Sequence, residues 1–400
     1  MSTFSVKRFW QMAKNQYHLF VAIFANIYYG FPSRKLKVIG ITGTDGKTTT
    51  THLIAHILKT AGKKVSFVSS VYASIAGKES DIGFHVTTPS SFAVQKLLKQ
   101  SVENHDEYFI LETTSHALDQ NRVWGIKYEI GLITNITHEH LDYHETYEEY
   151  VKAKLKLLLN SKVTVMNEDD ESYKRVQRSK CKVQSYNSKF KGLEKLSELT
   201  KFNQYNYAAA FTVCKQLGIH ESILKAMKTF QLPAGRLETV YDKDFKIIID
   251  FAHTPNAFAQ LLPEIRKIHL KQVGRLIHVF GAAGLRDSSK RYVMGKVSAT
   301  YSDAIILTEE DYRTEDLYKI CEQIGNGIKS VHKSYTIIEK RYDAIEKAIK
   351  MAKAEDIVVL TGKAHEKSLC RGTKEYPWNE KETVVKIIKL LKNINSDEKK

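Results

Sequence analysis

A strand, a glycine turn and a helix between Val38 and Leu58 decide the fold, and this stretch reads VIGITGTDGKTTTTHLIAHIL. The apolar run Leu36–Ile41 predicts a buried strand, and the residues from about Thr48 to Thr60 predict a helix. Glycines in such a turn let backbone N–H groups surround phosphates at the helix N-terminus. The lysine that follows can reach the β and γ phosphates, and the next threonine hydroxyl can bind Mg²⁺. We therefore expect Mg-ATP to bind to Gly43, Thr44, Asp45, Gly46, Lys47, Thr48 and Thr49.

The turn departs from the strict phosphate-loop string G-x-x-x-x-G-K-[ST], because Ile41 occupies the position of the first glycine. A glycine turn that binds no phosphate is therefore the alternative. The preceding strand, the two glycines and the run of threonines favour the phosphate loop.

The same alternation of strands and helices continues along the chain. Further apolar runs predict strands at Lys64–Ser69, Tyr108–Glu112, Ile130–Thr134 and Val163–Met166, and a helix at about Gln204–Leu217. The pattern restarts after Leu232-Pro-Ala-Gly235, with strands at Lys246–Asp250, Leu276–Phe280, Ala304–Leu307 and Ile357–Leu360. This predicts an α/β protein with a mainly parallel sheet in a central P-loop ATPase domain, residues 36–234, and a Rossmann-like α/β domain, residues 235–400.

Composition narrows the class of protein. A chain of 400 residues is long enough for two domains, and a formal charge of +16 fits an anionic partner. Because lysine is spread along the whole chain, a general compositional bias explains the charge equally well. The four cysteines (Cys181, Cys214, Cys321 and Cys370) form no CxxC pair, so we expect a reducing cytoplasm and neither disulfides nor a zinc ribbon.

An aromatic segment precedes the first strand. Residues Tyr17–Phe31 are rich in aromatic side chains, and no Lys, Arg, Asp or Glu lies between Lys14 and Arg34. The segment is too short to span a bilayer, and Asn26 interrupts it. Residues 1–35 therefore predict an amphipathic helical segment, which packs on the following domain, lies in a membrane interface or binds a partner.

Two further constellations follow predicted strands. Glu112 stands at the carboxyl end of a strand, where ligands of open α/β sheets bind. A second group, His138, His140 and His144, is compatible with zinc, but chemistry on ATP needs mainly oxygen ligands. We therefore favour one imidazole that assists a magnesium site, with a zinc site as the alternative.

These motifs together resemble the Mur ligases of peptidoglycan synthesis, and most of all the MurE type, which adds the third amino acid to UDP-N-acetylmuramoyl-L-alanyl-D-glutamate. The resemblance covers about Lys37 to Lys367. It rests on the ordered strings TGTDGKTTT, ETTSHALDQNR, TNITHEHLDYH, YVKAKLKLL, GRLE, DFAHTPNA, FGAAGLRDSSKR and GKAHE. It implies that ATP phosphorylates a carboxylate of the acceptor and that an amine then attacks the acyl phosphate. The second domain would then bind the incoming amino acid.

The resemblance also implies roles for individual residues. Lys154 matches the family lysine that carries a carbamate, an anion that would organise the magnesium site; a solvated helix lysine is the alternative. The implied catalytic residues are Lys47, Glu112, His140 and Lys154, and the implied metal ligands are Thr48, Glu112, His140 and Lys154. Further nucleotide contacts are implied for Asn135, Asn203, Asn206, Arg236, Asp250 and His253. Substrate contacts are implied for Thr87, Thr88, Ser115, Arg122, Lys290, Arg313 and Glu366.

The sequence departs from the family pattern at several places. About 36 residues precede the first strand, so we expect this chain to lack the uridine-binding domain of the MurE type. The acceptor is then free of UDP, linked to a lipid, or holds its UDP on another surface. Glu310-Asp-Tyr-Arg313 stands where diaminopimelate-adding enzymes have D-N-P-R, so the incoming amino acid stays open. Leu285 and Ala364 replace an aspartate and a glycine of the family strings.

Three functions follow from these observations. The first is an ATP-dependent, ADP-forming ligase that adds an amino acid to a muramoyl-peptide. The second is the same mechanism on a folate-like or poly-γ-glutamyl carboxylate, and the third is a non-catalytic subunit that keeps ATP as a structural element. The intact set of Lys47, Glu112, His140 and Lys154 opposes the third. We expect a cytoplasmic monomer with ATP and Mg²⁺, no nucleic-acid partner, and peripheral membrane contact through residues 1–33 as an option.

Overall fold

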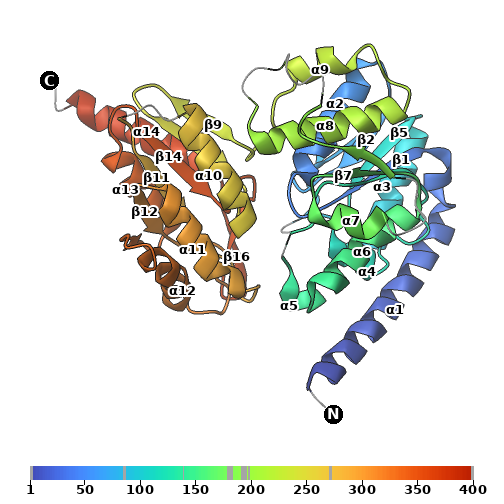
Figure 1. Cartoon of the computed structure of the whole chain (residues 1–400), viewed down its shortest axis with the longest axis horizontal. Helices are drawn as coiled ribbons and strands as arrows, with labels where there is room; N and C mark the ends of the chain where they lie inside the picture. Colours follow the sequence, from blue (N-terminus) through green and yellow to red (C-terminus); the bar gives the residue numbers. More distant parts are fainter. Residues whose placement is uncertain are drawn as a thin grey trace. The chain divides into compact units, whose positions relative to one another are not determined.

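The structure is a computed structural model of the chain and describes residues 3–83, 87–137, 139–177, 183–190, 196, 199–269 and 273–397. The chain forms two compact units, Met1–Gln231 and Leu232–Lys400. Each unit is a sheet flanked by helices (Figure 1). No helix among these residues is both long enough and apolar enough to span a bilayer.

The first unit contains an eight-stranded sheet in the order β4-β3-β2-β5-β1-β6-β7-β8. The six strands from β2 to β8 in this order are parallel, and β3 and β4 add an antiparallel edge. The strands are β1 Lys37–Thr42, β2 Val65–Val68, β3 Ala73–Ile75, β4 Lys78–Ser80, β5 Tyr108–Glu112, β6 Tyr128–Ile133, β7 Ser161–Asn167 and β8 Val183–Tyr186. The prediction of a mainly parallel sheet is confirmed.

Helices cover both faces of this sheet. They are α1 Thr3–Tyr29, η1 Pro32–Lys35, α2 Lys47–Thr60, α3 Ser91–Glu103, α4 Ser115–Asp119, α5 Leu141–His144, α6 Tyr147–Leu159, α7 Glu171–Gln177, α8 Lys201–Gln216 and α9 Ile223–Thr229. Alternate residues of β1 point to opposite faces, as strand geometry requires. Ile39 and Ile41 pack with α2, α8 and α9, whereas Val38 packs with α3 and α4.

Helix α6 approaches the centre of the sheet closely. A Cβ added to Gly40 would lie 2.5 Å from Leu157 Cδ1 and 2.7 Å from the Tyr128 ring. The glycine in the middle of β1 therefore lets α6 pack directly on the strand. As a result, Lys154, one turn before Leu157, lies against the end of β1.

The second unit contains a six-stranded sheet in the order β13-β12-β11-β14-β10-β9, parallel except for β9. Its strands are β9 Glu238–Asp242, β10 Lys246–Asp250, β11 Leu276–Phe280, β12 Ala304–Leu307, β13 Thr336–Ile337 and β14 Ile357–Thr361, with a separate hairpin of β15 Ser368–Arg371 and β16 Lys374–Pro377. The helices are α10 Pro255–His269, α11 Ser289–Tyr301, α12 Leu317–Lys329, α13 Arg341–Met351 and α14 Glu380–Asp397.

The core of the second unit explains the apolar strings of the sequence. Ile247 and Ile249 of β10, together with Val358 and Leu360 of β14, pack with α13 and α14 on one face. Helix α11 contacts both α10 and α12. Because strands such as Lys246–Asp250 are buried on both sides, they read as continuous apolar runs and are recognisable from sequence.

Candidate active site

The phosphate loop joins β1 to α2, as the sequence predicts. Gly46 precedes α2 and has φ +82°, and Gly43 has φ +152°. A Cβ on Gly43 would overlap Thr134 Oγ1, and a Cβ on Gly46 would overlap Asn206 Oδ1. Both glycines are therefore required, because the loop is pressed against side chains that follow β6 and lie on α8.

Polar groups after β6 hold the loop in shape. Asn135 Oδ1 accepts a hydrogen bond from Asp45 N at 2.9 Å, and Asn135 Nδ2 donates to Asp45 O at 3.1 Å. Thr134 Oγ1 donates to the same carbonyl at 2.7 Å. Thr44 N donates to the Asn135 carbonyl at 2.9 Å. The loop is thus already ordered, which lowers the entropy cost of binding a phosphate chain.

Lys47 lies on the loop itself. Its Nζ donates to the Thr44 carbonyl at 2.8 Å.

Thr49 is buried in the first turn of α2. Asn203 and Asn206 are buried on α8, where Asn206 Nδ2 donates to Asn203 Oδ1 at 3.1 Å. The structure therefore brings Asn206 next to the phosphate loop at Gly46.

Two of the predicted metal ligands converge. Thr48 Oγ1 lies 3.1 Å from both carboxylate oxygens of Glu112 and 2.8 Å from Ser70 Oγ. Ser70 N donates to Glu112 Oε2 at 2.9 Å. These possible metal-binding oxygens come from the carboxyl ends of β2 and β5 and from the start of α2. Hydroxyl and carboxylate oxygens are hard ligands, so this group fits Mg²⁺ better than a softer metal.

Lys154 is buried beside the loop. It is 1% exposed, its Nζ donates to the Gly43 carbonyl at 2.7 Å, and it lies 4.5 Å from the centre of the Tyr150 ring. Burial, followed by the positive charge of Lys47, lowers the pKa of Lys154 well below its usual value, although Glu139 and Asp45 act in the opposite direction. A neutral amine is nucleophilic, so this environment suits reaction with CO₂ and opposes a solvated lysine.

His140, the remaining predicted metal ligand, has its ring centre 6.1 Å from that of Tyr150. Its backbone is left-handed, with φ +57°, and its Nε2 lies 3.7 Å from Glu139 Oε2. The His140 and His116 ring centres are 4.8 Å apart. In the described ranges no three His, Cys, Asp or Glu side chains are grouped as metal ligands. His138, the third histidine of the zinc alternative, lies outside the described residues.

The candidate acceptor residues gather around the start of α4. Thr88 Oγ1 donates to the Glu112 carbonyl at 3.1 Å and accepts from Thr114 N at 2.9 Å. Arg122 Nη1 donates to the Thr88 carbonyl at 2.7 Å. Ser115 Oγ lies 3.0 Å from His144 Nε2, and burial lowers the pKa of His144 to about 4, so this imidazole is neutral near pH 7. Thr87 is the half-buried neighbour of Thr88.

In the second unit, three predicted nucleotide residues lie near Gly235. Asp250 accepts hydrogen bonds from Leu237 N and Ala252 N, each at 2.8 Å. The Arg236 guanidinium carbon lies 4.8 Å from the centre of the Phe251 ring, and His253 Nδ1 lies 2.9 Å from the Phe251 carbonyl. The turn that carries Arg236 is thus attached to the end of β10.

The residues of this unit that were predicted to contact the incoming amino acid lie around β12 and β14. Arg313 Nη1 donates to the Gly284 carbonyl at 2.8 Å. Glu366 forms an ion pair with the fully buried Lys363, which also contacts Asp311 at 2.9 Å. Lys290 is half-buried. The neighbouring Arg291 is fully buried and forms an ion pair with Glu315. Arg291 therefore has a structural role, unlike Lys290.

Several polar residues of these sites were not predicted from the sequence. They are Ser70, Tyr150, Glu139, Glu310, Asp311 and Lys363. Ser70 follows the carboxyl end of β2, so the rule that identified Glu112 could also have found it. Tyr150, whose OH lies 3.1 Å from Thr44 Oγ1, belongs to a helix far along the chain and had no local signal. Burial, followed by the negative charge of Asp311, raises the pKa of Glu310.

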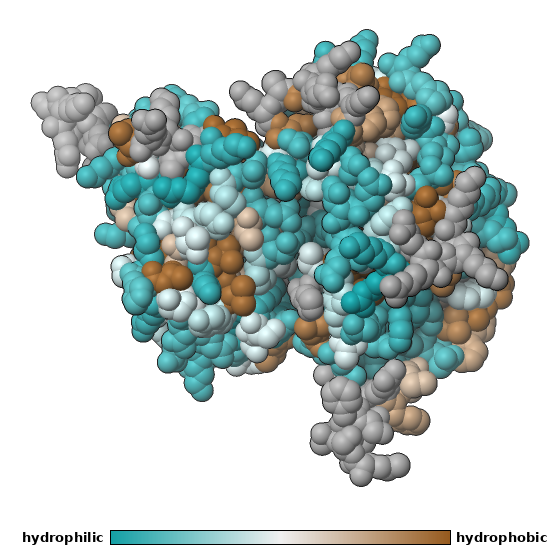
Figure 2. All heavy atoms as spheres, viewed as in Figure 1, coloured by the Kyte–Doolittle hydropathy of each residue, from teal (hydrophilic) through white to brown (hydrophobic). Residues whose placement is uncertain are grey.

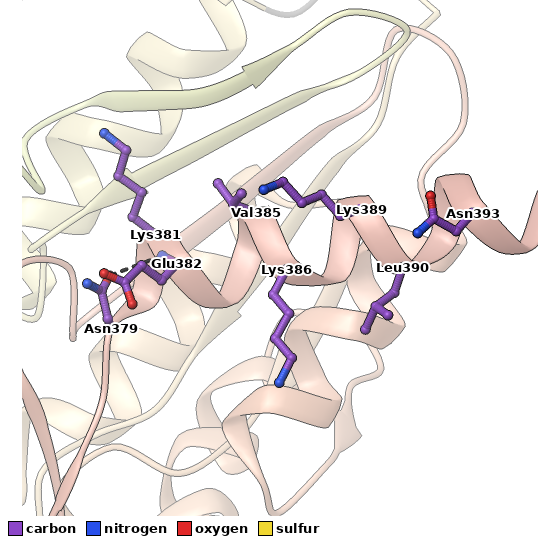
Figure 3. A pocket seen from close by; sticks show the side chains of 8 residues that line it. All are labelled: Asn379, Lys381, Glu382, Val385, Lys386, Lys389, Leu390 and Asn393. Atoms are coloured by element: carbon purple, nitrogen blue, oxygen red, sulfur yellow. Dashed lines mark hydrogen bonds between the residues drawn. The ribbon is translucent and has the colours of Figure 1, made fainter.

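A separate pocket on the second unit is unrelated to these residues. It has a volume of about 640 Å³ and is lined by Asn379, Lys381, Glu382, Val385, Lys386, Lys389, Leu390 and Asn393. Figure 3 shows that these side chains project from α14 and the residue before it. Because a single helix supplies the whole lining and none of the predicted site residues is included, we exclude this pocket as the active site.

Comparisons with known proteins match residues of both units. A family model described as Mur ligase middle domain matches residues 41–219, and one described as Mur ligase, glutamate ligase domain, matches residues 235–364. The UDP-N-acetylmuramoyl-L-alanyl-D-glutamate–2,6-diaminopimelate ligase 1 of Clostridium acetobutylicum is 36% identical and covers 93% of this chain and 82% of its own. The corresponding ligase of Aquifex aeolicus is 38% identical over 91% of this chain and 80% of its own.

Solved structures show the same fold. A UDP-N-acetylmuramoyl-L-alanyl-D-glutamate–2,6-diaminopimelate ligase has a TM-score of 0.57 at 26% identity and covers 89% of this chain and 79% of its own. E. coli FolC with DHPP and ADP has a higher TM-score, 0.69, over 93% and 92% of the two chains, but at 18% identity that likeness concerns the fold alone. With two domain models matched and such identity over most of its length, the chain belongs to the Mur ligase family.

Proposed function

We propose that this protein is an ATP-dependent ligase that adds an amino acid to the D-glutamyl carboxylate of a muramoyl-peptide in peptidoglycan precursor synthesis. The observation that carries the proposal is the convergence of the phosphate loop, the Thr48–Glu112 pair and the buried Lys154 in one unit. The relatives of 36% and 38% identity are named for this acceptor. They favour it over a folate-like acceptor, because the folate-type neighbours resemble the chain mainly in backbone.

The proposed reaction has two steps, as the resemblance to the Mur ligases implies. The acceptor carboxylate attacks the γ-phosphorus of ATP, and an acyl phosphate forms while ADP leaves. The amine of the incoming amino acid then attacks the acyl carbon, a proton is lost from nitrogen, and inorganic phosphate leaves as the amide forms. The loop N–H groups and Lys47 bind the transferred phosphoryl group and offset its charge. Lys47 would exchange its present bond to the Thr44 carbonyl for the phosphate.

Thr48 and Glu112, with Ser70 beside them, are the residues that would hold Mg²⁺. The ion would supply charge neutralisation for the phosphates. His140 is proposed as a further ligand on the strength of its position after β6 and of the family resemblance. Lys154 is proposed to react as a neutral amine with CO₂, releasing a proton and forming a carbamate. The carbamate would place an anion next to Gly43, where a negative ligand would serve the same site.

Acceptor and nucleotide contacts are assigned by the same combination of geometry and resemblance. Ser115 and Arg122 would bind the D-glutamyl end of the acceptor, with Thr87 and Thr88 in the turn beside it. The guanidinium of Arg122 suits a carboxylate because its N–H groups can bind both oxygens. Asn135, Asn203 and Asn206 would support the nucleotide from the first unit. Arg236, Asp250 and His253 of the second unit are proposed as nucleotide contacts on the strength of the resemblance alone.

The incoming amino acid is proposed to carry a distal carboxylate, with 2,6-diaminopimelate as the first candidate. Arg313 supports this, because its bonds to the Gly284 and Asp311 carbonyls use only Nη1. Lys290 and Glu366 would contribute to the same site. The protein is proposed to act as a monomer in the cytoplasm.

Phosphate release from ATP tests this function directly. We expect release to require both UDP-MurNAc-L-Ala-D-Glu and one amino acid, with diaminopimelate preferred to lysine, which lacks the second carboxylate. Arg313→Ala should remove that preference while lysine turnover changes little. Stimulation by a folate or poly-γ-glutamyl acceptor but by no muramoyl acceptor would overturn the proposal.

A further inference from the structure

Helix α1 contacts the rest of the first unit through amide side chains. Asn26 is completely buried, and its Nδ2 donates to the Ala22 and Trp124 carbonyls at 2.8 Å. Asn15 Nδ2 donates to Asp119 Oδ2 at 2.9 Å, and Gln11 Nε2 donates to Tyr143 OH at 2.8 Å. The inward side of this helix is therefore mixed: it combines these amides with the buried Ala22 and Ala25 and with half-buried side chains that include Leu19 and Tyr29. An ordinary surface helix instead turns its largest apolar side chains toward the core.

The opposite side of α1 is aromatic and exposed. Phe20, Phe24 and Ile27 follow the i, i+4, i+7 spacing of one helix face. Including these three, the face comprises Phe9, Trp10, Tyr17, Phe20, Phe24, Ile27 and Tyr28, each 60% to 75% exposed. Figure 2 shows brown and tan side chains where α1 follows the edge of this unit. We name these seven residues the aromatic face.

The aromatic face continues onto a neighbouring helix. Phe92 of α3 is 41% exposed, and its ring centre lies 6.2 Å from that of Tyr28. A continuous apolar surface of this kind marks a binding site for an apolar partner and not a random scatter of side chains.

Charge identifies the kind of partner. Residues 1–44 contain Lys7, Arg8, Lys14, Arg34, Lys35 and Lys37 and no Asp or Glu. A second copy docked through the same face would bring like charges together, whereas an anionic lipid surface would attract them. Tyrosine and tryptophan also suit the level of lipid headgroups, because their rings are apolar and their polar atoms stay hydrated.

We propose that the aromatic face of α1 docks the protein on the surface of an anionic lipid bilayer. The helix would lie along the interface with its aromatic rings among the headgroups and the upper acyl chains. Its basic neighbours would contact the lipid phosphates. The helix does not cross the bilayer, in keeping with its limited apolar length.

Docking through α1 would also orient the active site. The inward side chains Gln11 and Asn15 are bonded to Tyr143 and Asp119, and Tyr143 OH donates to Asp119 at 3.0 Å. Asp119 lies on α4 between Ser115 and Arg122, which the proposed function assigns to the acceptor. This step rests on that assignment. The acceptor site would thus be held at a fixed orientation beside the membrane surface.

Vesicle binding tests the docking surface. The full chain would be sedimented with vesicles of phosphatidylglycerol and phosphatidylcholine, and with vesicles of phosphatidylcholine alone. We expect binding to the anionic vesicles that weakens with salt. Phe20→Glu/Phe24→Glu should reduce that binding by roughly a hundredfold or more, because charges replace two aromatic side chains that would enter the bilayer. The matched control is Leu159→Glu/Val273→Glu, which adds the same charge at sites 71% and 83% exposed and should bind normally.

A second readout follows the helix itself. In a Trp124→Phe/Trp378→Phe background, Trp10 is the remaining tryptophan, and its fluorescence should shift to the blue on anionic vesicles. Equal binding by both double variants, no binding by the wild-type chain, or an unshifted Trp10 would overturn the proposal. So would a dimer that Phe20→Glu/Phe24→Glu dissociates, because the occupant would then be a second copy.

The two proposals can fail separately. Phosphate release with a soluble muramoyl acceptor and no vesicles measures the proposed function alone, and both double variants should retain it. Retained release also shows that the variants fold. Loss of vesicle binding with release intact therefore supports the docking surface, whereas absence of release in the wild-type chain contradicts the function and leaves the docking result intact.

Discussion

The replacement of Gly46 by alanine is the sharpest perturbation of the phosphate loop. Gly46 has φ +82°, and a Cβ there would overlap Asn206 Oδ1. The left-handed backbone costs a non-glycine residue about 1–2 kcal/mol. The overlap with a buried side chain adds roughly 1–3 kcal/mol, as overpacking does elsewhere. We therefore expect Gly46→Ala to lower the free energy of unfolding by about 2–5 kcal/mol.

Gly62 supplies the matched control, because it follows the other end of the same helix. It has φ +74°, but no atom lies within 4 Å of its added Cβ. Gly62→Ala therefore carries the backbone strain without the overlap and should cost only ~1 kcal/mol, since alanine also restricts the unfolded chain. The difference between the two variants measures the contact with Asn206.

Urea denaturation and nucleotide binding measure the two consequences. Gly46→Ala should weaken ATP binding roughly tenfold or more, since the loop must move away from α8, whereas Gly62→Ala should bind ATP normally. Adding Asn206→Ala to Gly46→Ala should recover part of the lost stability. If Gly46→Ala and Gly62→Ala behave alike in both assays, the close packing of the loop against α8 is refuted.

Three further predictions concern other buried or strained groups. Lys154→Ala should lower kcat by roughly 100-fold or more, and removal of dissolved CO₂ should inactivate the wild-type enzyme reversibly; full activity in either case removes the carbamate. His278 is buried between Ser298 and Thr361, and burial lowers its pKa to about 3. The contribution of this buried, neutral imidazole to the free energy of unfolding is complete above pH 6.5. It should be lost at ~1.4 kcal/mol per pH unit as the pH falls toward 3. His278→Phe should remove this pH dependence in urea titrations. Leu285 is 63% exposed and has a left-handed backbone at φ +55°, which asparagine tolerates better than leucine. Leu285→Asn should therefore stabilise the protein by ~1 kcal/mol in thermal unfolding. A lower midpoint temperature would contradict the idea that the backbone is strained at this position.

The central strands could be predicted from sequence because their burial leaves a direct signal. Lys246–Asp250 and Tyr108–Glu112 were predicted with the bounds that the structure has. The edge elements were not predicted. Strand β8, Val183–Tyr186, falls in a stretch that is polar in sequence, and the β15–β16 hairpin is short. β8 buries only Tyr186 and β16 is exposed throughout, so these strands have too few buried side chains to give a periodic signal.

The site could be predicted where it follows the carboxyl ends of strands. Glu112 was identified for this reason and Thr48 by the phosphate-loop motif, and the family resemblance implied that both bind one metal; the structure brings them within 3.1 Å. The burial of Lys154 had no local signal, since charged residues flank it on both sides in the sequence. It depends on the close approach of α6 to Gly40, which only the tertiary structure shows. The sequence likewise left open which side of α1 faces the rest of the unit, until its inward partners Asp119 and Tyr143 were known.

The transfer of phosphate from ATP to a carboxylate is the central claim, and an oxygen label tests it most directly. The D-glutamyl carboxylate of UDP-MurNAc-L-Ala-D-Glu would be labelled with ¹⁸O, and the released phosphate would be examined by mass spectrometry after ligation. An acyl phosphate leaves one carboxylate oxygen on phosphorus, so each phosphate released should carry one ¹⁸O from a fully labelled acceptor. Unlabelled phosphate released during amide formation would contradict the account.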